Sequence, residues 1–171
     1  KTIVDENSQI IEWNRHNEKV DLVKLKLNKP ILPFSKDTYT LIYLVKIPDA
    51  KFTRYGYDSE GRITLKNWFL NPSRYEHKQF VLQSNENLDD IPNAFSDFEI
   101  EFELPPNYSL SSNLSEISTT ELTNSKKILL SSKNKSDVAI VVQPTNTYQT
   151  YKNEIIEVSC GLEDNRVKDI D

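Results

Sequence analysis

Cysteine, glycine and methionine are nearly absent from this chain, and each shortage excludes a class of site. The 171 residues include one Cys, three Gly and no Met. One cysteine cannot form an internal disulfide, and no Cys/His cluster is present that could build a structural zinc site. Three scattered glycines exclude the Gly-rich loops that bind nucleotide phosphates. No apolar run reaches the ~18 residues of a membrane-spanning helix. We therefore expect no metal, no cofactor and no membrane span.

The pattern that is present has period two, which is typical of β-strands. Phe98 to Leu104 alternates apolar residues with three glutamates, and Leu22 to Leu27 alternates apolar residues with two lysines. Tyr39 to Ile47 is almost continuously apolar, which predicts a central strand buried on both faces. Phe52–Tyr57 and Ile63–Leu70 flank a polar stretch that ends in Gly61, which predicts a hairpin.

Helix signals are weak, because no window of 11 or more residues places apolar side chains cleanly on one helical face. Short strands with frequent turns predict an all-β fold. We expect a single-domain antiparallel β-sandwich of about 8–10 short strands over residues 1–171, with little or no helix. A partly open β-barrel is the alternative.

Two segments predict long loops, because neither shows a clear strand pattern. Residues 84–97 are acidic and polar, and residues 105–125 are rich in Ser, Thr and Asn. A structureless loop of this length in a compact domain is usually functional, disordered or a linker. The chain begins at Lys1 and lacks methionine, so we expect a fragment of a larger protein.

The sequence gives little evidence for a catalytic site. His16 and His77 have no Cys or His at ligand spacing, and Gly-x-Ser-x-Gly is absent. Cys160 lies on the apolar face of an expected strand, where a buried core thiol is the simplest interpretation. We expect that the chain is not an enzyme. An unrecognised hydrolase-type site is the third hypothesis, after an interaction module and a surface domain.

Basic and aromatic residues interleave between residues 51 and 80. This stretch carries six Lys or Arg against three Asp or Glu, although the whole chain has a net charge of −5. Arginine can pair with anions and stack on rings, so such a surface could bind a peptide, a phosphopeptide, a lipid headgroup or a single-stranded nucleic acid. The alternative is that the aromatic side chains enter the core and the cations form a solvated face. The candidate binding residues are Arg54, Tyr55, Tyr57, Arg62, Lys66, Trp68 and Arg74.

The stretch from Arg54 to Thr64 reads RYGYDSEGRIT. It resembles one unit of the tyrosine–aspartate repeats found in large toxin and cell-surface shells. The resemblance implies a hairpin with an aromatic strand, a polar turn and a Gly-Arg exit. It carries no function across, because those proteins use many copies.

Two further patterns concern modification. Ser118 precedes Glu121 by three residues, which is a pattern of acidic-directed phosphorylation and makes the 105–125 segment a candidate switch. Asn107, Asn113 and Asn134 each begin a glycosylation acceptor triplet. Composition alone can produce such triplets in a chain rich in Asn and Ser.

These observations favour a non-catalytic protein–protein interaction module within a larger intracellular assembly, in the cytoplasm or nucleus. It would dock on another protein or peptide through the aromatic/arginine hairpin or through an edge strand. The acidic net charge argues against nucleic acid as a partner. The alternative is a secreted or virion-surface β-sandwich, such as a coat, adhesin or glycan-binding domain.

Overall fold

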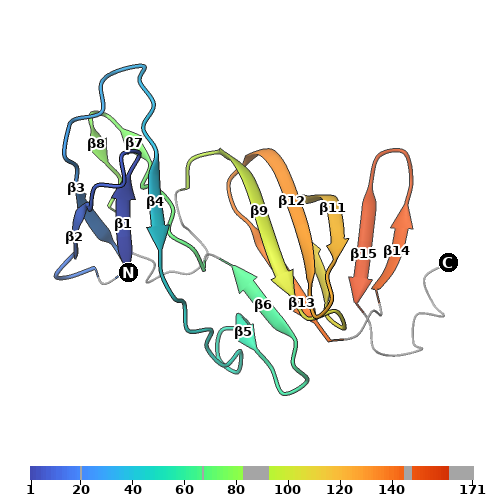
Figure 1. The fold of residues 1–171 in the computed structure, drawn as a ribbon. Helices are drawn as coiled ribbons and strands as arrows, with labels where there is room; N and C mark the ends of the chain where they lie inside the picture. Colours follow the sequence, from blue (N-terminus) through green and yellow to red (C-terminus); the bar gives the residue numbers. More distant parts are fainter. Residues whose placement is uncertain (20, 67, 83–92, 145–147, 162–171) are drawn as a thin grey trace. The chain divides into compact units, whose positions relative to one another are not determined.

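The structure is a computed structural model of the whole chain, and it describes residues 1–19, 21–66, 68–82, 93–144 and 148–161. These residues form fifteen strands and contain no helix (Figure 1). Every sheet is antiparallel, and no sheet of the described residues closes on itself. The predicted all-β antiparallel class with little or no helix is therefore confirmed.

Contacts divide the chain into two compact units, and each is described by itself. Unit 1 comprises residues 1–46 and 69–94, and unit 2 comprises residues 47–68 and 95–171. The larger number of strands, and most of the buried apolar side chains, belong to unit 2.

Unit 1 consists of three two-stranded sheets. The strand pairs are β1 (Thr2–Asp5) with β4 (Tyr39–Ile42), β2 (Glu12–Arg15) with β3 (Val23–Lys26), and β7 (Tyr75–Glu76) with β8 (Gln79–Phe80). Ile3 and Ile11 are its fully buried apolar side chains among the described residues. The alternation predicted for Leu22 to Leu27 is confirmed, since Val23 and Leu25 are half-buried and Lys24 and Lys26 are exposed.

The prediction of a central strand from Tyr39 to Ile47 is wrong. The strand ends at Ile42 and pairs with β1 alone. Ile42 is 66% exposed and Leu44 is fully exposed. The reason is that an apolar run shows which residues can be buried, whereas burial on both faces requires neighbours that this strand does not have within the described residues.

Unit 2 contains two larger sheets and one hairpin. The four-stranded sheet has the order β10 (Ser109–Ser112), β13 (Ala139–Gln143), β6 (Ile63–Lys66), β5 (Gly56–Tyr57). The three-stranded sheet has the order β11 (Ser115–Glu121), β12 (Lys126–Lys135), β9 (Ser96–Leu104). The hairpin pairs β14 (Tyr148–Lys152) with β15 (Glu157–Gly161).

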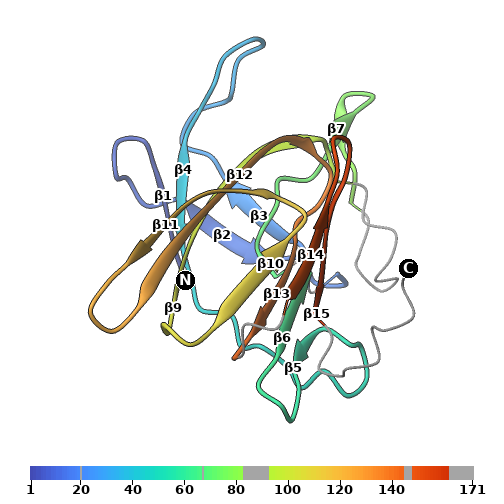
Figure 2. The same cartoon turned by 90° about the vertical axis from the view of Figure 1, so that its right-hand side faces the viewer.

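One long strand pair links the two larger sheets (Figure 2). β10 continues into β11, and β12 continues into β13, so both partners pass from one sheet to the other at the same corner. Asn113 fixes this corner with its amide. Its Nδ2 donates to the carbonyl oxygen and to Oδ1 of Asp137, both at 3.2 Å, and its Oδ1 accepts from Ala139 N at 2.9 Å.

The alternation of β9 is confirmed. Its apolar residues are half-buried and its glutamates are exposed along the strand. Phe102 lies opposite Ile128, and Ile100 lies opposite Leu130. Because opposed residues of an antiparallel pair share a face, these four side chains form an apolar layer. Ile128 and Leu130 belong to the buried core of unit 2.

The hairpin predicted between Phe52 and Leu70 is present as β5 and β6. Gly61 has φ of +79°, as a tight turn requires. Asp58 holds the turn, because its N–H donates to Arg62 O at 2.9 Å and its Oδ1 accepts from Arg62 N at 2.9 Å.

The prediction of a long loop over residues 105–125 is wrong. Most of this segment is strand, as β10 and β11. Its polar composition hides the strand, because all seven residues of β11 are exposed and no apolar alternation is needed. Of the expected 84–97 loop, residues 84–92 lie outside the described residues, and Ser96 and Asp97 begin β9.

Candidate functional site

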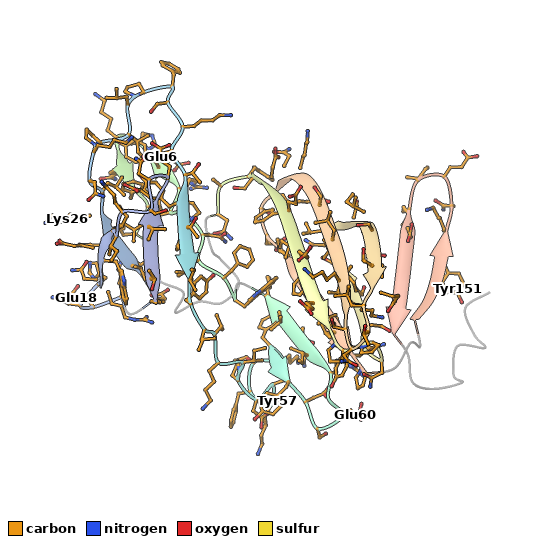
Figure 3. All side chains as sticks on the ribbon, in the orientation of Figure 1. Glu6, Glu18, Lys26, Tyr57, Glu60 and Tyr151 are labelled. Carbon is orange, nitrogen blue, oxygen red and sulfur yellow. The ribbon has the colours of Figure 1, made fainter. Side chains whose placement is uncertain are left out.

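Arg62, the central arginine of the candidate surface, pairs within its own turn. Its Nε lies 3.9 Å from Asp58 Oδ2, and its Nη2 lies 3.7 Å from Glu60 Oε2. The side chain is 33% exposed. Figure 3 shows Glu60 and Tyr57 on this hairpin of unit 2. The first role of Arg62 is therefore to close the turn.

Arg54, Tyr55 and Tyr57 lie on the approach to the hairpin. Arg54 is exposed with φ of +61°, and its N–H donates to Ala50 O at 2.9 Å. Tyr55 is half-buried, and Tyr57 is 49% exposed. Arg54 and Tyr57 are thus the most accessible of the candidate binding residues in this segment.

Trp68 and Lys66 are partly covered. The Trp68 ring centroid lies 6.1 Å from that of Phe102, with the rings tilted by 43°. Lys66 lies opposite Ala139 in the four-stranded sheet and is half-buried. The indole is therefore packed against β9 and does not form an open stacking platform.

Arg74 belongs to unit 1, whereas the other six candidates belong to unit 2. Its Nε lies 2.9 Å from Glu76 Oε1. Beside it, the rings of Tyr75 and Phe80 meet edge to face at 5.0 Å. The structure brings the other six candidates into unit 2, and the binding role of all seven stays a prediction.

β11 is an exposed strand of unit 2 that the sequence does not predict. It lies at one end of its sheet and pairs with β12, and within the described residues no strand pairs with its other side. All seven of its residues are exposed, including Ile117 at 59%. A β-bulge at Ile117 shifts the register between Glu116 and Ser118. Ser118, the phosphorylation candidate, lies at the middle of the strand.

The opposite end of this sheet is β9, and its exposed face is acidic. Lys127 Nζ donates to Glu101 Oε1 at 2.8 Å, and this hydrogen bond raises the pKa of the Lys127 ammonium. Ser125 Oγ donates to Glu103 Oε1 at 2.7 Å. Acidic side chains at a sheet edge discourage unwanted pairing.

His16 and His77 both lie outside the strands. His16 Nδ1 accepts from the backbone N–H groups of Glu18 and Lys19, at 3.2 and 3.3 Å. His77 is exposed in a turn with φ of +50°. No group of three or more His, Cys, Asp or Glu residues that could hold a metal ion occurs among the described residues. The side chain of Cys160 lies outside the description.

The three glycosylation acceptors differ in availability. Asn107 is exposed in the turn before β10, and Asn134 is exposed with φ of +56°. Asn113 uses its amide to bind Asp137 and Ala139. A glycan on Asn113 would replace an amide hydrogen that holds the corner, so Asn107 and Asn134 are the accessible acceptors.

Within the described ranges, no helix is long and apolar enough to span a membrane. A comparison of the chain with protein-family models, with curated proteins and with solved structures found no match.

Proposed function

We propose that this chain is a non-catalytic protein-binding β module of a larger intracellular assembly, and that it docks through the edge strand β11. The observation that carries the proposal is the exposure of all seven β11 residues on a strand paired on one side only within the described residues. An unpaired edge offers backbone N–H and C=O groups to a second strand. Such pairing needs neither a pocket nor a cofactor.

The aromatic/arginine hairpin supports docking less well than β11 does. Arg62 is held by Asp58 and Glu60, and Trp68 packs against Phe102. A partner would have to replace these contacts before it could use either side chain. Arg54 and Tyr57 remain accessible and could contribute to the rim of an interface.

A β-sandwich is the architecture that we propose for unit 2, because its two larger sheets share the strand pair that turns at Asn113. The contact of Trp68, which follows β6, with Phe102 of β9 supports this arrangement. So do the buried side chains of both sheets, Ile128 and Leu130 in one and Ile140 and Val142 in the other. The lone cysteine supports a reducing compartment.

The edge-strand proposal is tested with two matched substitutions of exposed isoleucines. Ile117→Lys adds a charge to β11, where the side chain is 59% exposed, and Ile156→Lys adds the same charge where the side chain is 56% exposed. Partner binding by the immobilised chain, measured against its stoichiometric partner, should weaken about tenfold or more for Ile117→Lys and remain unchanged for Ile156→Lys. Equal binding by both variants would contradict docking through β11.

The alternative is a secreted or virion-surface domain, and the exposure of Asn107 and Asn134 favours it. Mass spectrometry of the protein from its native source separates the two proposals. A glycan on either residue would support the surface domain and contradict an intracellular location. Glycan-free asparagines support the intracellular module.

A further inference from the structure

We propose that the strand that docks on β11 is an extended basic segment of another protein, with two Lys or Arg residues four positions apart. This inference rests on the proposed function, because it names the chemistry of the partner for the same edge. Three features of the molecule support it, namely the β-bulge, the two glutamates of β11 and the charge of unit 2.

The bulge brings Glu116 and Glu121 onto one face of β11. These residues are five apart in the sequence, and residues five apart on a regular strand lie on opposite faces. Their partners on β12 are Leu130 and Lys126, which are only four apart because the bulge adds one residue to β11 alone. Both glutamates therefore share the face on which Leu130 is buried.

A hydrogen bond within β11 supports this assignment of the face. Thr119 Oγ1 donates to Glu116 Oε1 at 2.7 Å. The two residues are three apart, so a regular strand would place their side chains on opposite faces. Thr119 lies opposite Ile128, which is buried on the same face as Leu130. The edge thus presents a carboxylate, a hydroxyl and a second carboxylate along one face.

The two carboxylates of β11 lack cationic partners within the described residues. No ion pair of Glu116 or Glu121 occurs there, although Lys126 lies opposite Glu121. At the other edge of the sheet, by contrast, Lys127 binds Glu101 at 2.8 Å. A strand added to β11 would place its side chains beside both unpaired carboxylates, where opposite charges stabilise the pairing. The charge of this edge therefore favours Lys or Arg in the partner.

The bulge also sets the spacing of the cations in the partner. A regular strand beside β11 covers the length from Glu116 to Glu121 with the same spacing as β12, which is four residues. Residues four apart share a face, so both cations would meet carboxylates. Cations three or five apart would lie on opposite faces, and only one could meet a carboxylate. The position midway between the cations would face Thr119, where a β-branched residue fits.

The charge of unit 2 favours the same partner. Unit 2 carries 11 Lys or Arg against 16 Asp or Glu, so the whole net charge of −5 belongs to this unit. Such a surface attracts a basic segment before contact and repels an acidic one. Because salt screens this attraction, raising the salt should weaken the complex.

The test is an NMR titration of the complete, isotope-labelled chain with synthetic peptides of Thr and Val, roughly nine residues long. The first peptide has two lysines four apart, and the second has the same composition with the lysines five apart. The first should shift the amide signals of β11, with a dissociation constant on the order of 1 mM because one strand pair buries little surface. The second should bind about threefold more weakly, since one charge pair is lost. Equal binding of the two peptides overturns the proposal.

Variants of the chain locate the two charge pairs. Glu116→Gln and Glu121→Gln should each weaken binding of the first peptide about threefold and remove its advantage over the second. Glu154→Gln removes the same charge from the exposed turn between β14 and β15, so binding should stay almost unchanged. A loss of binding in Glu99→Gln in place of the two β11 variants would put the peptide on β9 and overturn the proposal.

Other occupants of the β11 edge give different results. Amide signals of β11 that shift with protein concentration in the absence of peptide would assign the edge to a second copy of the chain and overturn the basic segment. Native partner capture that is lost in Ile117→Lys, together with equal binding of the two peptides, would overturn this inference while supporting the proposed function.

Discussion

Of Gly56 and Gly61, Gly56 has less room for a side chain. Its φ is +128°, and a Cβ would lie 2.0 Å from Pro48 O and 2.8 Å from Pro48 C. Both contacts are with backbone, where Tyr57 N donates to Pro48 O, so no side chain can move aside. We expect Gly56→Ala to lower the free energy of unfolding by about 3 kcal/mol or more, as measured by urea denaturation.

Gly61→Ala is the control for this prediction. Its φ is +79°, and the nearest atom to a Cβ would be Pro144 Cγ at 3.4 Å. An alanine at this position would be strained by its left-handed backbone conformation but would meet no backbone clash. We therefore expect the free energy of unfolding to fall by about 1 kcal/mol. A larger effect at Gly61 than at Gly56 would contradict the close approach to Pro48.

The pKa of Tyr39 is raised because its hydroxyl donates a hydrogen bond to Asp37 Oδ2 at 2.7 Å. This hydrogen bond is the main cause that raises the pKa of Tyr39 to about 12. A folded-state pKa above the unfolded value of 10.0 means that the contribution to stability is complete below pH 10 and is lost as the pH approaches 12.

Absorbance titration of the phenolate measures this effect, with Tyr39→Phe subtracted to isolate one tyrosine. In the wild type the difference curve should have its midpoint near the pKa of about 12. In Asp37→Asn the pKa of Tyr39 should fall toward the ordinary value of 10.0 because the anionic acceptor is gone. An unchanged midpoint in Asp37→Asn would assign the shift to another cause.

Among the strands, Asn113 holds the corner where the two larger sheets meet. Its amide makes three hydrogen bonds across the corner, two to Asp137 and one to Ala139. Asn113→Ala should lower the free energy of unfolding by about 2 kcal/mol, since three bonds are lost at a partly exposed site. Asn107→Ala, in an exposed turn, should have almost no effect in the same denaturation experiment. Equal effects would show that the corner does not depend on this amide.

Strands that alternate were predictable from the sequence, and strands that do not were missed. The sequence predicts β9 and the β5–β6 hairpin because each has one apolar face or a recognisable turn. It does not predict β11, because a strand exposed at all seven positions needs no apolar side chains. The Tyr39–Ile47 run predicts a longer strand than the structure has, because composition does not show how many neighbouring strands are present.

The candidate site was predictable only where its contacts are local. Pairing of Arg62 with Asp58 and Glu60 lies within one turn and can be inferred from sequence spacing. The contact of Trp68 with Phe102 joins residues far apart in the chain, so no local pattern reveals it. The edge position of β11 depends on sheet order, which is likewise a long-range property.

The two units of the whole molecule differ in how much apolar surface they bury. In unit 1 the fully buried apolar side chains of the described residues are Ile3 and Ile11. In unit 2 six apolar side chains are buried, namely Leu114, Ile128, Leu130, Val138, Ile140 and Val142. Because burial of apolar side chains is the main source of stability, unit 1 should be the weaker unit.

We therefore expect unfolding in urea to occur in two steps, with unit 1 unfolding first. Ile3→Ala should shift only the first step, and Ile140→Ala only the second, because each side chain belongs to one core. Each cavity should cost about 2–5 kcal/mol of the unfolding free energy of its own unit. Hydrogen exchange with mass spectrometry assigns each step to its strands, with β1 and β4 reporting on unit 1 and β12 and β13 on unit 2. A single transition that both substitutions shift equally would mean that the two units unfold as one cooperative body, and their separate cores would then have no separate stability.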